Sequence, residues 1–272
     1  MNPLAITRLE DVGLSAERLG RVSAWIRKQI SADRTAGIVA LVARRGRTAF
    51  VDVAGKADVA RGTPMAVDTI FRIYSMTKPL TSVAIMMLYE DARFQLDDPI
   101  SRFIPAFAGQ RVLTGGSRGK IDTVPAARDI TFRDLLTHTS GLTYGFMEST
   151  LADALYRANK IDFQTENTSL KELVEKAAAL PLLAQPGRRW NYSISTDVLG
   201  YLVEVISGMP FESFLKERVI DPLKLVDTDF HVPEAKHGRL SANYTVARDG
   251  GVHLIDDPAK SPYLRPRNVN SG

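Results

Sequence analysis

The chain has 272 residues, of which 44% are hydrophobic and 24% are charged, as in an ordinary globular protein. Its net charge of +4 reflects 35 basic against 31 acidic side chains, and these are interspersed, which argues against a nucleic-acid or membrane-surface partner. The sequence contains no cysteine, which excludes disulfides, thiolate metal sites and a cysteine nucleophile.

The beginning of the chain shows no targeting segment. It lacks the charged stretch followed by an apolar stretch that a secretory signal needs. No run of about eighteen apolar residues, the length needed to span a bilayer, occurs anywhere in the sequence. We therefore expect a cytoplasmic protein.

The first hundred residues predict a helix, several strands and a second, very apolar helix. Ser15 is a suitable N-cap for a helix over 15–31, and two β-rich runs then surround a tight turn at Arg45-Gly46. The alternating segment 68–74 predicts a third strand. The apolar helix follows at once, and we expect its core-facing stripe to contain Leu80, Val83, Ala84, Met87 and Leu88.

After residue 100 the pattern becomes mainly helical. Thr131 and Asp134 have the spacing of a capping box at the start of a short helix. Residues 146–183 predict polar-faced helices, and a further helix over 195–207 ends at Gly208, with little strand signal later. The clearest helix of the middle region is expected to bury Leu170, Leu173, Val174, Ala177 and Ala178.

This order of elements predicts an α+β protein with an inserted all-helical region. The glycine-rich segment 114–120 lacks the spacing of a phosphate-binding loop and is expected to be a flexible surface loop. The expected domains are residues 1–100, the first part of a mixed α/β domain with the apolar helix; 101–210, mainly helical; and 211–272, a return toward the α/β domain.

Ser75 and Lys78 stand three residues apart at the beginning of the apolar helix. Residues at this spacing share one helix face, so their side chains can touch. The first turn of a helix also offers unpaired N–H groups and the positive end of the helix dipole, which favour negative charge developing there. A desolvated lysine beside a hydroxyl can accept the hydroxyl proton. The pattern therefore marks Ser75 as a candidate nucleophile and Lys78 as its base.

The Ser-x-x-Lys pattern is short, and two further copies occur, one within 117–120 and one within 213–216. Only the copy at Ser75 follows a predicted strand and opens an apolar helix. A second proton-transfer group is needed, and Tyr192 is the candidate, because a tyrosine near an ammonium group can relay protons. Local spacing alone leaves open that Tyr192 simply packs beside Trp190.

With these residues in view, the chain resembles the class C β-lactamase-like serine hydrolases, and in particular their esterase branch, the family VIII carboxylesterases. The resemblance implies a β-lactamase/penicillin-binding-protein-like fold, an antiparallel sheet flanked by helices together with an all-helical domain. Four blocks carry it, in family order: residues 71–107, 130–142, 186–208 and 219–230.

The resemblance also implies roles for individual residues. Ser75 is the nucleophile that forms an acyl-enzyme, Lys78 and Tyr192 share the proton transfers, and the backbone N–H of Ser75 forms half of the oxyanion hole. His138 is implied to be a hydrogen-bonded framework residue and not a base. Tyr144, Phe146 and Ile194 are expected to bind substrate.

Two departures from the family pattern affect the expected function. The lactamase pattern Tyr-x-Asn has Ile194 at its third position, which favours ester substrates because no amide is present to engage a β-lactam. Relatives also continue with strands that complete the oxyanion hole, so the chain is expected to be C-terminally truncated and poorly active. One lost oxyanion-hole donor costs on the order of 3 kcal/mol of transition-state stabilisation.

A small-molecule ester is thus the expected partner, with no cofactor and no metal. The glycine-rich dinucleotide fingerprint and the G-x-S-x-G motif are missing. A β-lactamase or D,D-peptidase remains an alternative, as does a non-catalytic binding or scaffold protein of the same fold. Four histidines lack metal-ligand spacing with carboxylates: His138, His231, His237 and His253.

Overall fold

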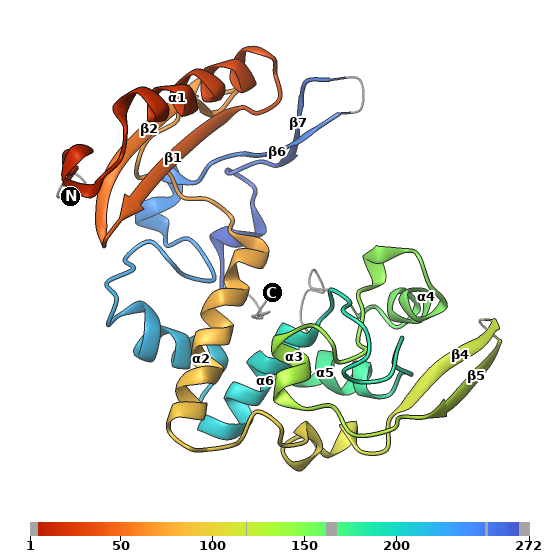
Figure 1. Ribbon diagram of the computed structural model, residues 1–272. Helices are drawn as coiled ribbons and strands as arrows, with labels where there is room; N and C mark the ends of the chain where they lie inside the picture. The colour runs from red at the N-terminus through yellow and green to blue at the C-terminus, as the bar shows by residue number, and fades with distance from the viewer. Residues whose placement is uncertain (1–4, 118, 162–167, 248–249, 267–272) are drawn as a thin grey trace. The chain divides into compact units, whose positions relative to one another are not determined.

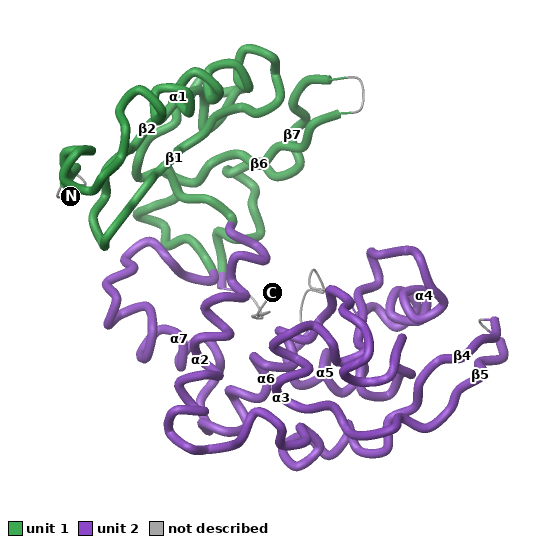
Figure 2. The backbone as a smooth tube through the Cα atoms, in the orientation of Figure 1, with its two compact units in different colours: residues 1–72, 231–265 green, residues 73–230, 266–272 purple. Residues whose placement is uncertain are grey.

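The chain folds into two compact units, which Figure 2 distinguishes by colour. Unit 1 consists of residues 1–72 and 231–265, and unit 2 consists of residues 73–230 and 266–272. The computed structural model describes residues 5–117, 119–161, 168–247 and 250–266.

The boundaries between the units lie after Arg72, after Phe230 and after Arg265. They do not coincide with the ranges 1–100, 101–210 and 211–272 expected from the sequence. As a consequence, the apolar helix that begins near Ser75 belongs to the same unit as the helical middle of the chain.

In unit 1, helix α1 (Ala16–Ser31) packs against an antiparallel sheet (Figure 1). The predicted N-cap is confirmed, because the Ser15 hydroxyl accepts a hydrogen bond from the N–H of Arg18 at 3.3 Å. The predicted hairpin turn is confirmed as well. The sheet has the order β1 (Gly37–Arg44), β2 (Arg47–Asp58) and β3 (Thr63–Pro64).

The later part of unit 1 contains a second antiparallel hairpin, made of β6 (Asn243–Val246) and β7 (Val252–Asp256). The expectation of little strand here was wrong, because short strands with exposed side chains lack an alternating apolar pattern. The predicted strand over 68–74 was also wrong: Ile70 forms a single bridge, to Leu240, in place of a continuous ladder.

Unit 2 is built around α6 (Ser195–Ser207), which ends where predicted, at Gly208 in the left-handed conformation. Four helices pack against α6, whereas α4 (Leu151–Ala158), which comes earlier in the chain, lies apart from α6 (Figure 1). The four are α2 (Lys78–Glu90), α3 (Phe132–Leu136), α5 (Leu170–Ala178) and α7 (Phe211–Leu215), the last continuing as a π-helical turn, Lys216–Ile220.

The predicted set of buried residues is confirmed for α5, but for α2 a partly different set is buried. All five expected residues of α5 are buried, whereas Val83 of α2 is exposed. Helix α2 is apolar on nearly every side, so the spacing of its apolar residues does not fix which face turns inward. The residues of α2 that are buried are Thr81, Ala84, Ile85 and Leu88.

The glycine-rich segment is a β-hairpin and not the loop expected from the sequence. Strands β4 (Arg111–Ser117) and β5 (Lys120–Pro125) pair antiparallel. Gly116 has φ 109°, and a Cβ there would collide with the carbonyl oxygen of Lys120. Glycine is therefore required for the close approach of the two strands, and its presence does not indicate flexibility.

Capping boxes begin three helices of unit 2. The predicted box of α3 is confirmed, since Thr131 and Asp134 bond to each other's backbone N–H groups. Boxes at Thr150–Asp153 and Ser169–Glu172 start α4 and α5 in the same way. Across the described part of the chain no single helix has the length and apolarity to cross a membrane, and only α6 with Phe211–Ile220, bent by 83°, meets both requirements as a pair.

Candidate active site

Ser75 lies in a short 3-10 turn, η2 (Tyr74–Thr77), that leads directly into α2. Its side chain is exposed. Tyr74 has φ 42°, a left-handed conformation that is a strained one for a bulky residue and costs about 1–3 kcal/mol. Such strained backbone is concentrated at functional sites. The turn thus presents a serine hydroxyl at the start of a helix that is anchored in the core of unit 2.

Lys78 is the first residue of α2 and is half-buried. Its Nζ donates a hydrogen bond to Ser75 Oγ at 3.3 Å, the contact that the three-residue spacing predicts. The same nitrogen lies 5.0 Å from the ring centre of Tyr192 and 5.6 Å from that of Tyr144. At these distances an ammonium group is attracted to a ring face. Lys78 is therefore held between the serine and two aromatic rings.

Tyr192 reaches the same serine from the segment that precedes α6. Its hydroxyl donates to Ser75 Oγ at 2.7 Å. The segment is held in place by Asn191, whose backbone N–H donates to the carbonyl oxygen of His138 at 2.8 Å. The structure thus brings the side chains of Ser75, Lys78 and Tyr192 together, all within unit 2.

The three residues expected to bind substrate occupy different environments. Phe146 is 48% exposed and stacks on Tyr144 with 4.8 Å between ring centres. Tyr144 is only 2% exposed, and its hydroxyl donates to Asp197 Oδ2 at 3.4 Å. Ile194 is 1% exposed and belongs to the hydrophobic core. Of the three, Phe146 has a surface that a ligand can reach. Tyr144 is buried and packs against the Phe146 ring, and Ile194 is buried in the core.

The other two Ser-x-x-Lys copies have a different geometry. Ser117 and Lys120 are paired across the turn of the β4–β5 hairpin. In the second copy, Lys216 Nζ binds Asp221 Oδ1 at 2.7 Å. Within the described residues, only the copy at Ser75 has a hydrogen bond between its serine and lysine side chains.

His138 lies beside these residues and packs its ring against Tyr192, with 5.0 Å between ring centres. The His138 ring also meets the Trp190 ring in an edge-on arrangement, with 6.4 Å between ring centres. Burial, and secondly the positive charge of Lys78, lower the pKa of His138 to about 4. The imidazole is therefore neutral at neutral pH, in keeping with a framework position.

Sequence reasoning missed a chain of three buried serine hydroxyls that continues from His138. His138 Nδ1 lies 3.4 Å from Ser193 Oγ, which lies 2.7 Å from Ser195 Oγ. Ser195 Oγ in turn lies 2.8 Å from Ser140 Oγ. Their positions in two of the resemblance blocks gave no sign of this pairing, because the serines meet only once the loop 138–142 packs against the start of α6.

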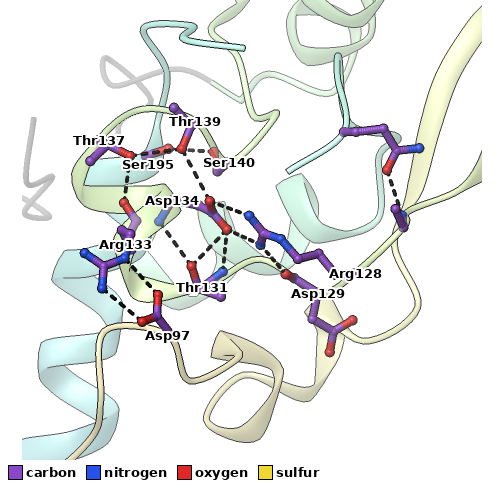
Figure 3. Close-up of polar contacts among 12 residues, drawn as sticks. Asp97, Arg128, Asp129, Thr131, Arg133, Asp134, Thr137, Thr139, Ser140 and Ser195 are labelled. Atoms are coloured by element: carbon purple, nitrogen blue, oxygen red, sulfur yellow. Dashed lines mark hydrogen bonds and ion pairs between the residues drawn. The ribbon is translucent and has the colours of Figure 1, made fainter. Parts of the chain in front are cut away.

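Asp134 is bonded to Thr131 and Thr139, as Figure 3 shows, and because Thr139 follows His138 in the chain, Asp134 anchors the loop that carries His138. One carboxylate oxygen accepts hydrogen bonds from the N–H and the hydroxyl of Thr131, both at 2.9 Å, and the other accepts from the Thr139 hydroxyl at 3.3 Å. Arg128 donates to both oxygens, at 2.5 and 2.9 Å. Burial disfavours the charge, but these hydrogen bonds outweigh it and hold the pKa of Asp134 below its ordinary value.

No group of three or more His, Asp or Glu side chains positioned to hold a metal ion occurs among the residues that the structure describes. The site instead consists of the Ser75 hydroxyl, an amine, two phenols and a neutral imidazole. Groups of this kind transfer protons and acyl groups.

Comparison with known proteins places this site in context. A family model described as Beta-lactamase matches residues 22–263. Protein Rv1367c of Mycobacterium tuberculosis (strain ATCC 25618 / H37Rv) is 38% identical over 245 residues, which are 89% of this chain and 59% of that protein. Esterase EstB of Burkholderia gladioli is 34% identical over 244 residues, 89% of this chain and 58% of EstB.

A solved structure shares the fold over the same extent. EstCE1, described as a hydrolase with promiscuous acyltransferase activity, matches with a TM-score of 0.75 and 31% identity, over 88% of this chain and 59% of EstCE1. The chain thus spans a little under three fifths of the length of each of these relatives.

Proposed function

The chain belongs to the beta-lactamase family and has its α+β fold, and from this premise we propose that it is a serine hydrolase that cleaves carboxylic esters through an acyl-enzyme on Ser75. One observation carries the proposal: Ser75 Oγ accepts hydrogen bonds from both Lys78 Nζ, at 3.3 Å, and Tyr192 Oη, at 2.7 Å. A hydroxyl in contact with two proton-transfer groups is the arrangement of an activated nucleophile.

In the first half of the reaction, Ser75 Oγ attacks the carbonyl carbon of the ester. Its proton passes to Lys78 Nζ or to Tyr192 Oη, whichever has given up its own proton, so that this contact reverses its direction in the reaction. The backbone N–H of Ser75, at the start of a helix, donates to the oxygen on which negative charge develops. The C–O bond to the alcohol then breaks, the alcohol takes up the proton, and the acyl group remains on Ser75.

In the second half, a water molecule attacks the acyl carbon. The same pair of residues takes the proton from water and returns it to Ser75 Oγ as the acid leaves. Lys78 and Tyr192 both contact Ser75 Oγ, and Lys78 Nζ lies 5.0 Å from the centre of the Tyr192 ring. Either side chain can therefore act as proton donor or proton acceptor at Ser75 Oγ without a large movement.

Ester substrates are favoured over β-lactams by the residue two positions after Tyr192. Ile194 offers no amide to a lactam side chain, and it is buried in the core. The name of one relative, Esterase EstB, supports the same substrate class. A non-catalytic role is disfavoured because a scaffold gains nothing from an exposed serine held against a lysine and a tyrosine.

Acyl transfer to an alcohol is the second candidate function. The observation that favours it is the description of EstCE1 as having promiscuous acyltransferase activity. In this reaction an alcohol in place of water attacks the acyl carbon of the Ser75 acyl-enzyme, and the proton transfers are unchanged.

The test compares the 272-residue chain with its Ser75→Ala variant on three reagents. These are a short-chain p-nitrophenyl ester, a chromogenic cephalosporin and a fluorophosphonate probe, the last of which reports nucleophile reactivity in a single turnover. We expect probe labelling and ester hydrolysis that are both lost in Ser75→Ala, with the hydrolysis slow because the chain is expected to lack one donor of the oxyanion hole. Cephalosporin turnover above ester turnover would indicate a β-lactamase, and absence of labelling in the unchanged chain would indicate a non-catalytic protein.

A further inference from the structure

The hydroxyls of Ser140, Ser195 and Ser193 form an unbranched row that ends at His138 Nδ1. The row has three gaps: Ser140 to Ser195 at 2.8 Å, Ser195 to Ser193 at 2.7 Å, and Ser193 to His138 at 3.4 Å. All three serines are buried, so no bulk water is available to them. Each hydroxyl proton must therefore be accommodated within the row or be left without an acceptor.

Counting the protons fixes their direction. Three serine hydroxyls bring three protons, and each gap holds one proton between its two heavy atoms. The three gaps are filled when Ser140 donates to Ser195, Ser195 donates to Ser193, and Ser193 donates to Nδ1. A proton on Nδ1 would be a fourth proton for three gaps and would leave one buried hydroxyl proton unpaired, which is unfavourable.

The backbone contacts to the row do not relieve this excess. The N–H of Leu142 donates to Ser140 Oγ at 3.2 Å, and the N–H of Ser195 donates to Ser193 Oγ at 3.3 Å. Both are further donors, and the described residues supply the row with no acceptor other than the imidazole. The direction of the row is thus set toward His138.

We propose that this serine row holds His138 as the neutral tautomer protonated on Nε2, and that this fixed imidazole is a positioning residue for Tyr192. The second part rests on the proposed function, because it concerns the orientation of the phenol on Ser75. The ring of His138 lies against the ring of Tyr192 at 5.0 Å, and the carbonyl oxygen of His138 accepts the N–H of Asn191 at 2.8 Å. Side chain and backbone of one residue thus support the tyrosine that bonds to Ser75.

A neutral His138 also suits the charge of its surroundings. Lys78 is close enough to His138 for its positive charge to act on the imidazole. A second positive charge would repel the lysine and oppose the contact of Lys78 with Ser75. The serine row disfavours a charged His138. An imidazolium carries a proton on Nδ1, and in the row that atom already accepts the hydroxyl proton of Ser193.

The tautomer is measured by nitrogen-15 NMR of the four histidines, with His138 assigned by the loss of its signals in His138→Asn. Asn suits this position because it tolerates the left-handed backbone, φ 54°, and its amide oxygen can still accept from Ser193. We expect an unprotonated Nδ1 and a protonated Nε2 in the unchanged protein. A proton on Nδ1 at neutral pH would overturn the first part of the proposal, whatever the protein's activity.

The positioning role is measured by the rate at which a fluorophosphonate labels Ser75. Ser193→Ala removes the donor to Nδ1, and His138→Asn removes the ring while keeping the acceptor. We expect each to slow labelling about tenfold, since small displacements of a reacting group have effects of this size or more. Ser241→Ala is the matched control, a buried serine of unit 1, and is expected to label at the unchanged rate.

The outcomes separate the two proposals. Labelling at the unchanged rate in both Ser193→Ala and His138→Asn, with both proteins folded by thermal melting, would overturn the positioning role and leave the hydrolase intact. Absence of labelling in the unchanged chain would instead overturn the proposed function, while the tautomer of His138 would still be decided by NMR.

Discussion

The phenol oxygen of Tyr192 and the hydroxyl oxygen of Ser75 lie 2.7 Å apart, although 117 positions separate them in the chain. The two residues come from different elements, the turn before α2 and the segment before α6, and these helices pack against each other in unit 2. The contact between the two oxygens therefore depends on the packing of α2 against α6. Substitutions can test separately what the contact does for the reactivity of Ser75 and what it does for the stability of the protein.

Replacing Tyr192 by phenylalanine removes one proton-transfer group and leaves the ring. We expect the labelling of Ser75 to slow by about 10²–10³-fold, because a positioned acid–base group contributes on this scale. Thermal melting should change little, since the Tyr192 ring still packs on His138. Labelling of Tyr192→Phe at the rate of the unchanged protein would show that the phenol takes no part in the reaction.

Replacing Lys78 by methionine or by arginine tests whether the amine is needed as a proton acceptor. Methionine keeps the length of the side chain without the amine, and arginine keeps a permanent charge that cannot be given up. We expect both variants to label at least about a hundredfold more slowly. Lys216→Met, which alters an exposed Lys–Asp pair in the other helical copy, is the control and should label normally. Activity retained in Lys78→Arg would mean that charge alone suffices.

The stability of the protein should depend on pH through His138. The pKa of this group is about 4 in the folded protein, below its ordinary value of 6.5. Between these values the unfolded chain binds the proton and the folded protein does not. The contribution of His138 to the free energy of unfolding is therefore present in full above about pH 6.5, and it is lost as the pH falls toward 4.

Urea unfolding at about pH 7 and about pH 5 measures this effect. We expect the unchanged protein to lose about 1–2 kcal/mol of unfolding free energy between the two conditions as a result of His138, and His138→Asn to lose correspondingly less. The carboxylate of Asp134 titrates below this window, because its pKa is lowered. An identical loss in the two proteins would contradict a depressed pKa at His138.

Two acidic residues near α3 should differ greatly in their importance for stability. Asp134 is buried and accepts hydrogen bonds from Arg128, Thr131 and Thr139, so Asp134→Ala is expected to destabilise unit 2 by about 3 kcal/mol. Asp97 pairs with Arg133 at the exposed surface, where solvent screens the two charges, so Asp97→Ala should change the stability far less than Asp134→Ala. Equal midpoints of urea unfolding for the two variants would refute this ranking.

The contact between Ser75 and Lys78 could be predicted from the sequence because it is local. A spacing of three residues at a helix start requires no knowledge of the rest of the fold. The capping box of Thr131 and Asp134 was predictable for the same reason, as was the apolar stripe of α5. These features depend on residues within one or two helical turns.

The features that were missed depend on packing between distant segments. The glycines of 114–120 permit two strands to approach closely, which sequence alone does not distinguish from a flexible loop. Ile194 was expected at the surface of a pocket, yet the packing of α6 buries it. The row from Ser140 to Ser193 forms between the loop 138–142 and the start of α6, and a serine carries no sequence pattern that reveals its partner.

The most direct test of the central claim is to locate the acyl group. The protein is mixed with an activated ester, quenched in acid within the first turnover, and its peptides are mapped by mass spectrometry. We predict one acyl adduct per chain, on Ser75, and its disappearance in Ser75→Ala. An adduct on any other residue, or an adduct that persists in Ser75→Ala, would contradict the account.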